Sequence, residues 1–337
     1  MRIGVIGAGA WGTALARLLA RAGHDVLLWA YEREVVESVA RVHENTLFLA
    51  GVTLPDSLRA TGDIAEAVRE KDLLVEVAPS HVVRRVMAQA APHIDGEPLI
   101  AILTKGLEND SLATMDEVLA DVLPARLHGR LCAVSGPSFA REVAQDMPTV
   151  VVAAARDPGV AADVQRALAT DRFRVYTSDD IVGVELGGAL KNVIAIAAGA
   201  SDGLGFGHNT RAALITRGLA EIARLGARKG ANPLTFAGLA GMGDLLLTCT
   251  GELSRNRTVG FELGRGRKLA DLLGEMRVVA EGVKTAKAAR ELARKVGVEM
   301  PIVELVYRVL YEDMPAPDAV NALMQRPLGA ERGAEAT

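Results

Sequence analysis

The first half of the chain alternates short apolar runs with longer amphipathic stretches. The short runs are rich in β-branched residues and leucine and predict buried strands. The longer stretches repeat apolar residues every three or four positions, as Leu15, Leu18 and Leu19 do, and predict helices. Strands are expected at 2–6, 25–29, 73–77, 99–103, 131–135 and 149–153, and helices at 11–22, 33–43, 80–91 and 111–122.

Strands and helices that alternate in this way predict parallel strands with right-handed crossovers, and therefore a doubly wound sheet. After about residue 181 the strand-like runs stop and helical spacing takes over. Helices are expected there at 184–200, 208–229, 256–264, 284–296 and 301–311. The sequence thus predicts an α/β fold with an N-terminal Rossmann-type domain over 1–182, an all-α domain over 183–328 and a disordered tail over 329–337.

Composition narrows the class of protein. The 337 residues are 50% hydrophobic and 24% charged, which suits two domains that each have a core. A net charge of -4 and an aromatic content of 4% do not indicate a nucleic-acid-binding protein, which would be expected to carry a basic surface or aromatic stacking residues. The two cysteines, Cys132 and Cys249, lie far apart and are expected to be reduced thiols of a cytoplasmic protein.

The apolar start of the chain could be taken for a secretory signal, but glycines interrupt it. No uncharged run reaches the roughly 20 residues that a membrane-spanning helix requires. We therefore expect a protein that does not span a membrane, and the sequence leaves a homodimer open.

Gly7, Gly9 and Gly12 form a GxGxxG pattern that directly follows a predicted strand and opens a predicted helix. This context indicates a dinucleotide-binding turn. Gly7 permits the tight turn, Gly9 lets the pyrophosphate approach the backbone, and Gly12 lets helix and strand pack closely. The free N–H groups of the helix N-terminus then bind the phosphates.

In such folds, residues at the end of the second strand contact the adenosine ribose and discriminate between its 2′-hydroxyl and a 2′-phosphate. An acidic residue there favours NAD, whereas an arginine accommodates the 2′-phosphate of NADP. This chain has Tyr31, Glu32 and Arg33 in succession. Glu32 and Arg33 could equally just open the next helix, so the sequence leaves the choice between NAD and NADP open.

Hydride transfer at a carbinol carbon requires a group that exchanges the hydroxyl proton. Lys191 lies in a segment, 187–195, that is otherwise almost wholly apolar. Burial lowers the pKa of a lysine, which makes it a candidate proton acceptor near neutral pH. The alternative is a lysine whose ammonium group extends from a core helix to solvent.

Lys105 follows the predicted strand at 99–103, and therefore belongs at the carboxyl edge of the sheet, where ligands of such folds bind. A surface-loop lysine is the other interpretation. Asp244 is an acid in an apolar, glycine-rich segment. It is expected to be a partner for a lysine or a substrate hydroxyl, or else a helix N-cap.

Ser254, Arg255 and Asn256 open a predicted helix, and their hydroxyl, guanidinium and amide groups predict a phosphate site there. A simple capped helix start would look the same. Ser135 to Ser138 end a strand and could supply further donors. No cluster of His, Asp or Glu has metal-ligand spacing, so no metal is expected.

Together these segments resemble the bacterial type of NAD(P)-dependent glycerol-3-phosphate dehydrogenase. The resemblance runs from residue 1 to about 326. It rests on IGVIGAGAWGTALA from Ile3, TKGLE from Thr104, VSGPSFAREV from Val134, GVELGGALKNVIAIAAGASDGLGFGHNTRAALITRGLAE from Gly183, GLAGMGDLLLTCTGELSRNR from Gly238 and EGVKTAK from Glu281.

The resemblance implies reversible reduction of dihydroxyacetone phosphate to sn-glycerol 3-phosphate with NADH or NADPH, which supplies glycerophospholipid synthesis. It implies that Lys191 is the proton acceptor and that Lys105 and Asp244 complete the catalytic set. Besides Lys191, the positions that match the substrate site are Lys105, Gly136, Ser138, Asp244, Ser254, Arg255 and Asn256. Those that match cofactor contacts, beside the glycine turn, are Trp11, Lys105, Ala140, Arg255, Val279 and Glu281.

Two positions bear on the choice of cofactor and on the distinction from related dehydrogenases. The family usually has a basic residue or histidine at the position of Tyr31, so recognition of a 2′-phosphate would depend on Arg33. Related hydroxyacid dehydrogenases place an asparagine four residues after the catalytic lysine, whereas here position 195 is alanine and Asn192 adjoins Lys191. A hydroxyacid or opine dehydrogenase, or a catalytically silent NAD(P)-binding protein, remains as an alternative.

Overall fold

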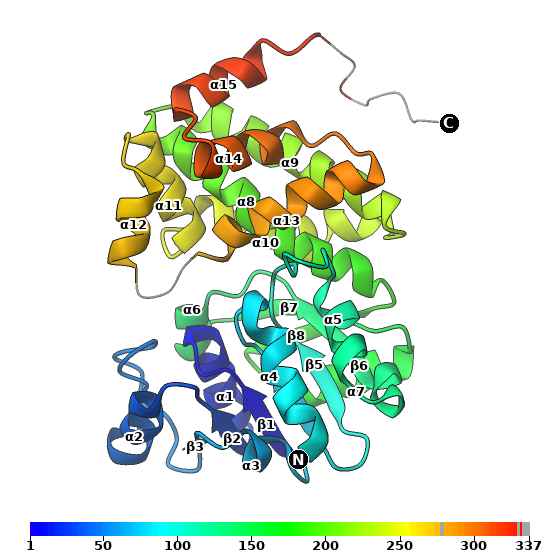
Figure 1. Ribbon diagram of the computed structural model, residues 1–337. Coiled ribbons are helices and arrows are strands. Elements are labelled where there is room, and N and C mark those ends of the chain that lie inside the picture. The colour runs from blue at the N-terminus through cyan, green and yellow to red at the C-terminus, as the bar shows by residue number, and fades with distance from the viewer. Residues whose placement is uncertain (277–279, 329–330, 332–337) are drawn as a thin grey trace.

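The computed structural model describes residues 1–276, 280–328 and 331. A layer of mostly parallel strands flanked by helices forms one half of the molecule, and a bundle of helices forms the other half (Figure 1). This arrangement confirms the predicted fold class. The expected tail at 329–337 lies outside the described residues apart from Glu331, which is exposed.

Eight strands form one sheet in the order β3-β2-β1-β4-β5-β6-β7-β8. The strands are β1 (Arg2–Ile6), β2 (Asp25–Trp29), β3 (Arg59–Thr61), β4 (Leu73–Glu76), β5 (Leu99–Ile102), β6 (Leu131–Ser135), β7 (Thr149–Ala154) and β8 (Phe173–Ser178). The order reverses between β1 and β4, which is the point where doubly wound sheets bind dinucleotides. The glycine turn leaves β1 at this point.

The sheet differs from the sequence prediction in two respects. All described neighbours pair in parallel, as expected, except β6 and β7, which are antiparallel. Strands β3 and β8 were missed. β3 has three residues, and β8 exposes alternate side chains at the edge of the sheet, so neither shows a buried apolar run.

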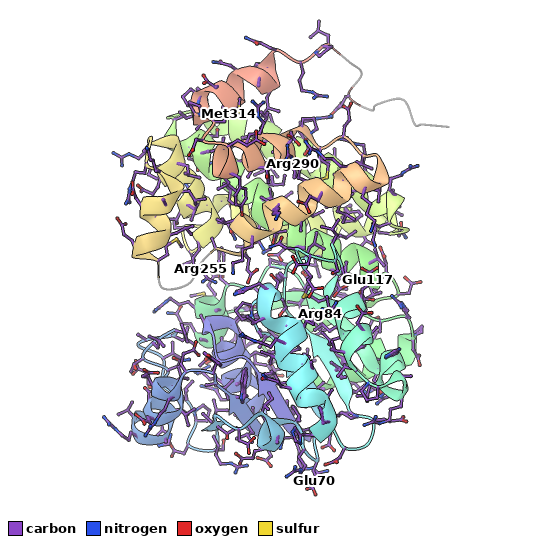
Figure 2. The ribbon with its side chains drawn as sticks, viewed as in Figure 1. Glu70, Arg84, Glu117, Arg255, Arg290 and Met314 are labelled. Carbon is purple, nitrogen blue, oxygen red and sulfur yellow. The ribbon has the colours of Figure 1, made fainter. Side chains whose placement is uncertain are left out.

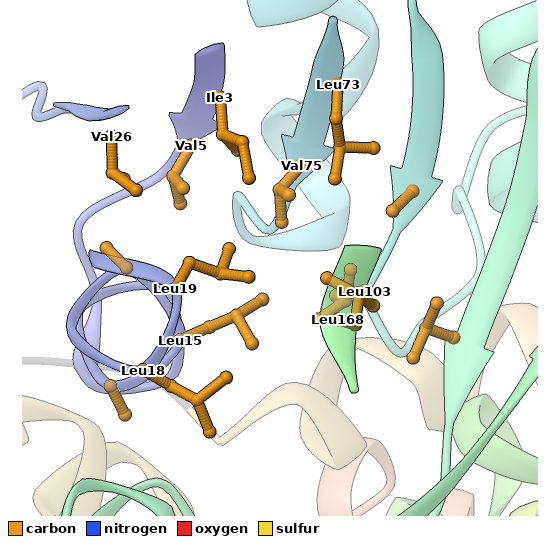
Figure 3. Packing of buried hydrophobic residues seen from close by; sticks show 14 of the residues in the cluster. Ile3, Val5, Leu15, Leu18, Leu19, Val26, Leu73, Val75, Leu103 and Leu168 are labelled. Atoms are coloured by element: carbon orange, nitrogen blue, oxygen red, sulfur yellow. The ribbon is translucent and has the colours of Figure 1, made fainter. Parts of the chain in front are cut away.

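Helix α1 (Ala10–Arg21) packs its apolar face on the sheet and holds the glycine turn in place. Figure 3 shows Leu15 and Leu19 of this helix directed at Ile3, Val5 and Val75 of the central strands. These side chains are fully buried. Burial of each contributes about 1.5–3 kcal/mol, so the strand, turn and helix form one rigid unit.

The remaining helices of this half lie between successive strands. They are α2 (Arg33–Val42), α3 (Ile64–Val68), α4 (Val83–Ala90), α5 (Met115–Val122), α6 (Ala140–Ala144) and α7 (Pro158–Leu168). The helix expected at 111–122 begins only at Met115. Thr114 and Glu117 form a capping box there, and Leu112 has a left-handed φ of 63°, so the chain before Thr114 cannot be helical.

The second half is built around α8 (Ile181–Gly203). Against it pack α9 (His208–Arg228), α10 (Asp244–Thr250), α11 (Arg255–Gly264), α13 (Glu281–Val296) and α14 (Pro301–Tyr311). In the outer part of this half, α12 (Leu269–Glu275) packs on α11, and α15 (Ala316–Met324) packs on α14 and α11. The domain boundary expected between residues 182 and 183 falls in the first turn of α8, and the division into domains stays a prediction.

By length and composition α8 could cross a membrane, and it is the one helix of the described residues that could. Within the protein, however, 89% of its most apolar 18-residue window is buried. A core helix that other helices surround meets the same test, and α8 has the contacts of such a helix.

Candidate active site

Close approach of backbones brings α8 and α10 together. A Cβ on Gly187 would lie 2.6 Å from the carbonyl oxygen of Ala240, so only a glycine fits at this crossing of α8 and the segment before α10. That segment, Leu239–Gly243, is a π-helical turn, which aims Asp244 at α8. The outcome is that Lys191 of α8 and Asp244 of α10 face one another in the protein interior.

Two lysines share the carboxylate of Asp244. The Nζ atom of Lys191 lies 2.5 Å from Oδ1, and the Nζ atom of Lys105 lies 2.7 Å from Oδ2. Asp244 is 1% exposed and Lys191 is 7% exposed. The structure thus brings together the three residues predicted to be catalytic, although they are far apart in the sequence.

The electrostatics of this triad favour proton transfer near neutral pH. Burial lowers the pKa of Lys191 to about 8; the carboxylate of Asp244 opposes this shift and the charge of Lys105 adds to it. Burial alone would raise the pKa of Asp244, but the two ammonium groups outweigh it and hold that pKa below its usual value. Asp244 therefore stays ionised while Lys191 can gain or lose a proton.

Thr248 is a member of this cluster that the sequence analysis missed. Lys191 donates a hydrogen bond of 2.8 Å to its Oγ1, and that hydroxyl donates in turn to the backbone carbonyl of Asp244, at 2.6 Å. Thr248 follows Asp244 by four residues, one helical turn, on a helix that the sequence analysis did not predict. The i, i+4 spacing to Asp244 was the signal that could have indicated it.

Lys105 has further partners at the end of β6. Its Nζ donates to the carbonyl of Gly136 at 3.0 Å and to Oγ of Ser138 at 3.4 Å. Gly136 has a φ of +142°, a conformation that a residue with a Cβ rarely adopts. The segment 135–138 was expected to supply donors, and the structure shows that Gly136 supplies an acceptor, which fixes the ammonium group beside Asp244.

Asn256 is connected to this cluster through Asn192. Its Nδ2 donates to Oδ1 of Asn192 at 2.9 Å, and Nδ2 of Asn192 reaches the carbonyl of Lys105 at 3.4 Å. Oδ1 of Asn256 accepts from the backbone N–H of Gly282 at 2.8 Å. The amide at the start of α11 is thus oriented by the protein, and its second N–H proton has no acceptor among the described residues.

Ser254 is the N-cap of α11, because its Oγ accepts the N–H of Arg257 at 3.2 Å. The structure thus confirms the helix cap, and the phosphate site at this helix start stays a prediction. Arg255 is exposed, and Figure 2 shows it at the margin of the helical half that faces the sheet. Among the described residues it has no hydrogen-bond or ion-pair partner, so its guanidinium group is available to an anion.

The glycine turn has the geometry that a dinucleotide requires. Gly7 has a φ of +121°, and a Cβ on Gly12 would lie 1.9 Å from the carbonyl oxygen of Gly7. A Cβ on Gly9, in contrast, would meet no atom of the described residues within 4 Å. Helix α1 has neither a side-chain cap nor an acid in its first turn. The protein itself thus leaves open the space above Gly9 and the first N–H groups of α1, which fits a pyrophosphate.

The residues expected near the adenosine ribose are on the surface. Tyr31 is 78% exposed. Arg33 is also exposed, and its Nε lies 2.7 Å from the carboxylate of Glu37, one turn further along α2. The ion pair directs Arg33 along its own helix, so the geometry does not decide between NAD and NADP.

Glu281, another expected cofactor contact, joins the two halves of the molecule. Its carboxylate accepts the hydroxyl of Ser80 at 2.7 Å and the N–H of Ser80 at 3.3 Å. Trp11 lies at the start of α1 with its ring 6.5 Å from that of Phe173, and Ala140 begins α6. Val279 lies outside the described residues.

No group of three His, Cys, Asp or Glu side chains that could hold a metal ion occurs among the residues with a described placement. The polar groups gathered here are ammonium, guanidinium, amide and hydroxyl groups around one carboxylate. Such a set binds and polarises an anionic, oxygen-rich substrate, and Lys191 can exchange a proton with it.

Comparisons with known proteins agree with this chemistry. The family model of the NAD-dependent glycerol-3-phosphate dehydrogenase N-terminus matches residues 2–161, and that of the C-terminus matches residues 180–321. A glycerol-3-phosphate dehydrogenase [NAD(P)+] of Geobacter sulfurreducens is 63% identical over 331 residues, which cover 98% of this chain and 99% of the relative. The enzyme of that name from Myxococcus xanthus is 56% identical over 326 residues, 97% of each chain.

Solved structures give the same result. A crystal structure of glycerol-3-phosphate dehydrogenase from Coxiella burnetii has a TM-score of 0.91 at 40% identity, over 96% of this chain and 99% of that chain. D-mandelate dehydrogenase in complex with NADH shares the fold at a TM-score of 0.60 and 14% identity, over 93% and 98% of the chains. The chain therefore belongs to the NAD-dependent glycerol-3-phosphate dehydrogenase family.

Proposed function

We propose that this chain catalyses the reversible reduction of dihydroxyacetone phosphate to sn-glycerol 3-phosphate with NADH or NADPH. The observation that carries the proposal is the buried triad of Lys191, Asp244 and Lys105. Hydrogen bonds through Asn192 connect this triad to Asn256 at the start of α11. Membership of the family supports the same reaction.

The nicotinamide cofactor, when bound, supplies the hydride to C2 of the substrate. Lys191 then delivers a proton to the oxygen on C2, and in the reverse direction it accepts that proton. A pKa of about 8 suits both roles, because a general acid–base group works best when its pKa lies near the operating pH. Lys105 stabilises the negative charge that develops on the oxygen.

Asp244 and Thr248 keep Lys191 oriented, since each accepts a hydrogen bond from its ammonium group. Arg255, Asn256 and the first turn of α11 are proposed to hold the substrate phosphate. An arginine can bind two phosphate oxygens at once, and the helix N-terminus adds its own favourable field. The positions proposed for the cofactor are the glycine turn, Trp11, Ala140 and Glu281.

A spectrophotometric assay tests the proposal directly. Purified protein is mixed with dihydroxyacetone phosphate and with NADH or NADPH in parallel, and the loss of nicotinamide absorbance is followed. Unphosphorylated dihydroxyacetone and 2-oxo acids are the matched alternatives. Turnover of a 2-oxo acid, with none of the phosphate ester, would instead support a hydroxyacid dehydrogenase.

The cellular setting is a separate part of the proposal. We infer that the enzyme works in the cytoplasm, where its product supplies glycerophospholipid synthesis, and that it forms a homodimer. Cys132 and Cys249 are buried free thiols, which suits a reducing compartment. Exposed apolar side chains such as Met324, at 81% exposure, offer surface for association. Light scattering of the purified protein measures the oligomeric state, and a monomer mass would refute the dimer.

A further inference from the structure

Glu76 is a buried carboxyl group that the proposed mechanism does not use. It is the last residue of β4, next to the point where the strand order reverses, and it is fully buried. Oε1 accepts the backbone N–H of Ala78 at 2.8 Å and lies 3.0 Å from Oγ1 of Thr104. Oε2 is buried without a partner among the described residues.

This carboxyl group links two segments that lead to the active site. The first is the segment 77–80, called here the β4 turn, which packs against the glycine turn: a Cβ on Gly7 would lie 2.9 Å from the N atom of Ala78. The second begins with Thr104 and carries Lys105. Glu76 binds Ala78 in the first segment and Thr104 in the second, so one side chain sets their relative position.

The number of protons available for the hydrogen bonds between Glu76, Thr104 and Ala78 indicates whether Glu76 is ionised. Thr104 has one hydroxyl proton, but its Oγ1 lies 2.5 Å from the carbonyl oxygen of Ala78 and 3.0 Å from Oε1 of Glu76, and both are acceptors if Glu76 is ionised. If Glu76 is protonated, it donates to Thr104, and Thr104 donates to Ala78. Every contact then has its own proton.

The surroundings of Glu76 favour the protonated form. The neighbouring strands flank it with Ile6 and Ile102, and the core on its side of the sheet is apolar. Burial raises the pKa of Glu76 to about 8; the hydrogen bonds that Thr104 and Ala78 can donate oppose this shift, and the carboxylate of Glu281 adds to it. Among the described residues, Glu281 at the start of α13 is the charged side chain that acts on Glu76. Lys284 of α13 and Arg85 of α4 act with Glu281 on His81, which follows the β4 turn.

We propose that Glu76 carries a proton at neutral pH and, in that form, is a positioning residue that locks the β4 turn to the segment of Lys105. Loss of the proton leaves Thr104 unable to serve both acceptors and places a second negative charge near Glu281. The contact between the β4 turn and the segment of Lys105 is then lost, and the β4 turn no longer supports the glycine turn. Cofactor affinity therefore falls at alkaline pH. The inference rests on the proposed placement of the dinucleotide on the glycine turn.

The first test measures stability against pH without any ligand. The unfolded chain loses the Glu76 proton near the usual pKa of 4.5, whereas the folded protein holds it up to about 8. The folded state thus binds more protons in that window, so the stability contributed by Glu76 decreases as pH rises from 4.5 to 8. Glu76→Gln keeps a donor for Thr104 and cannot ionise, so its Tm relative to wild type should rise across the window. A constant Tm difference would overturn the proposal.

The second test measures the Kd of NADH by fluorescence between pH 6.5 and 9.5. Wild-type Kd should rise above about pH 8, by at most about tenfold per pH unit, and Glu76→Gln should abolish this rise. Glu76→Leu and Thr104→Val lose the lock and should bind weakly at every pH. Glu221→Gln is the matched control: this buried carboxyl also has a raised pKa, of about 7, but it binds the start of α14.

The outcomes separate the two proposals. If wild type and Glu76→Gln bind NADH with the same pH dependence, Glu76 has no positioning role, while the cofactor site stands. The same conclusion follows if Glu76→Leu is folded and binds like wild type. If wild-type protein binds neither NADH nor NADPH at any pH, the placement of the dinucleotide fails, and the role of Glu76 fails with it.

Discussion

The ammonium group of Lys191 and the carboxylate of Asp244 lie 2.5 Å apart in the interior, although the two residues are 53 positions apart in the sequence. Lys105 occupies the other oxygen of the same carboxylate. One negative charge therefore serves two positive ones. Burial of the surplus positive charge is what lowers the pKa of Lys191, and it also makes the cluster attractive to an anionic substrate.

Replacement of Lys191 with methionine, which has a similar shape but no proton to exchange, should lower kcat by about 10²–10⁴-fold. The Kd of NADH should stay close to that of wild type, because Lys191 is proposed to act on substrate and not on cofactor. Stopped-flow or steady-state kinetics with dihydroxyacetone phosphate measures the first effect and fluorescence titration the second. Near-normal turnover would contradict the role of Lys191.

The pH profile should report the same group. Reduction requires protonated Lys191, so kcat should decrease as pH rises through about 8, whereas oxidation requires the neutral amine and should accelerate over that range. Asp244→Asn removes the charge that raises the pKa of Lys191, so the pH at which kcat changes should decrease in both directions of the reaction. Profiles of kcat in the two directions measure this shift, and unchanged limbs in the variant would refute the coupling.

Thr248→Val should weaken catalysis without unfolding the protein. It removes one acceptor from the Lys191 ammonium group, and a hydrogen bond to a charged group contributes about 1.5–3 kcal/mol. We expect kcat to fall at least tenfold and the alkaline limb to move to lower pH by less than in Asp244→Asn. Thr250→Val is the control, because Thr250 lies on the same helix, is exposed, and donates its hydroxyl to the carbonyl of Leu246, away from Lys191. Equal effects in the two variants would exclude a specific role.

Arg255→Ala should mainly weaken binding of the phosphate group. Loss of a charge-assisted contact of about 1.5–3 kcal/mol raises KM for dihydroxyacetone phosphate by about 10–100-fold. Activity with unphosphorylated dihydroxyacetone should change little. Arg265→Ala, at the opposite end of α11, is a suitable control because its guanidinium group stacks on Phe261. An unchanged KM in Arg255→Ala would contradict the phosphate site.

The glycine turn offers a pair of variants that separates folding from binding. Gly12→Ala places a Cβ 1.9 Å from the carbonyl of Gly7, so it should destabilise the protein by about 1–3 kcal/mol. The new Cβ of Gly9→Ala meets no atom within 4 Å in the part of the chain that the structure describes, so the stability of this variant should stay within about 0.5 kcal/mol of wild type. Its Kd for NADH should nevertheless rise tenfold or more, which corresponds to about 1.4 kcal/mol. Thermal unfolding and NADH titration measure the two effects. Wild-type affinity in Gly9→Ala would show that no ligand occupies that space.

The sequence predicted those parts of the molecule that depend on local pattern. The six strands with continuous apolar runs were correct in place, and so was the change to helices after residue 181. The antiparallel pairing of β6 and β7 was not predictable in this way, because the direction of a strand depends on the path of its connection. Helix α10 was missed because it is only seven residues long and follows a glycine-rich segment.

The site was predictable as a set of residue types but not as a geometry. Lys105, Lys191 and Asp244 were identified from unusual settings and from resemblance, and the structure brings them together. That one carboxylate bridges both lysines, and that Thr248 completes the cluster, depends on the crossing of α8 with the turn before α10. Such a crossing is a tertiary property. The buried state of Glu76 likewise follows from the strands beside it.

The reversed direction of β7 and β8 has a geometric consequence for Lys191. The chain leaves β8 alongside the body of the sheet, where Ile181 and Val184 pack against Ala133 of β6, and not at the edge where ligands bind. Helix α8 must then run along the sheet before it reaches that edge. The number of residues in the helix before Lys191 therefore fixes the position of this lysine. Each residue of an α-helix adds a rotation of about 100° and a rise of about 1.5 Å. Inserting a single residue before Lys191 would therefore turn the lysine away from Asp244. The spacing between the last strand and the lysine is therefore as much a part of the active site as the lysine itself.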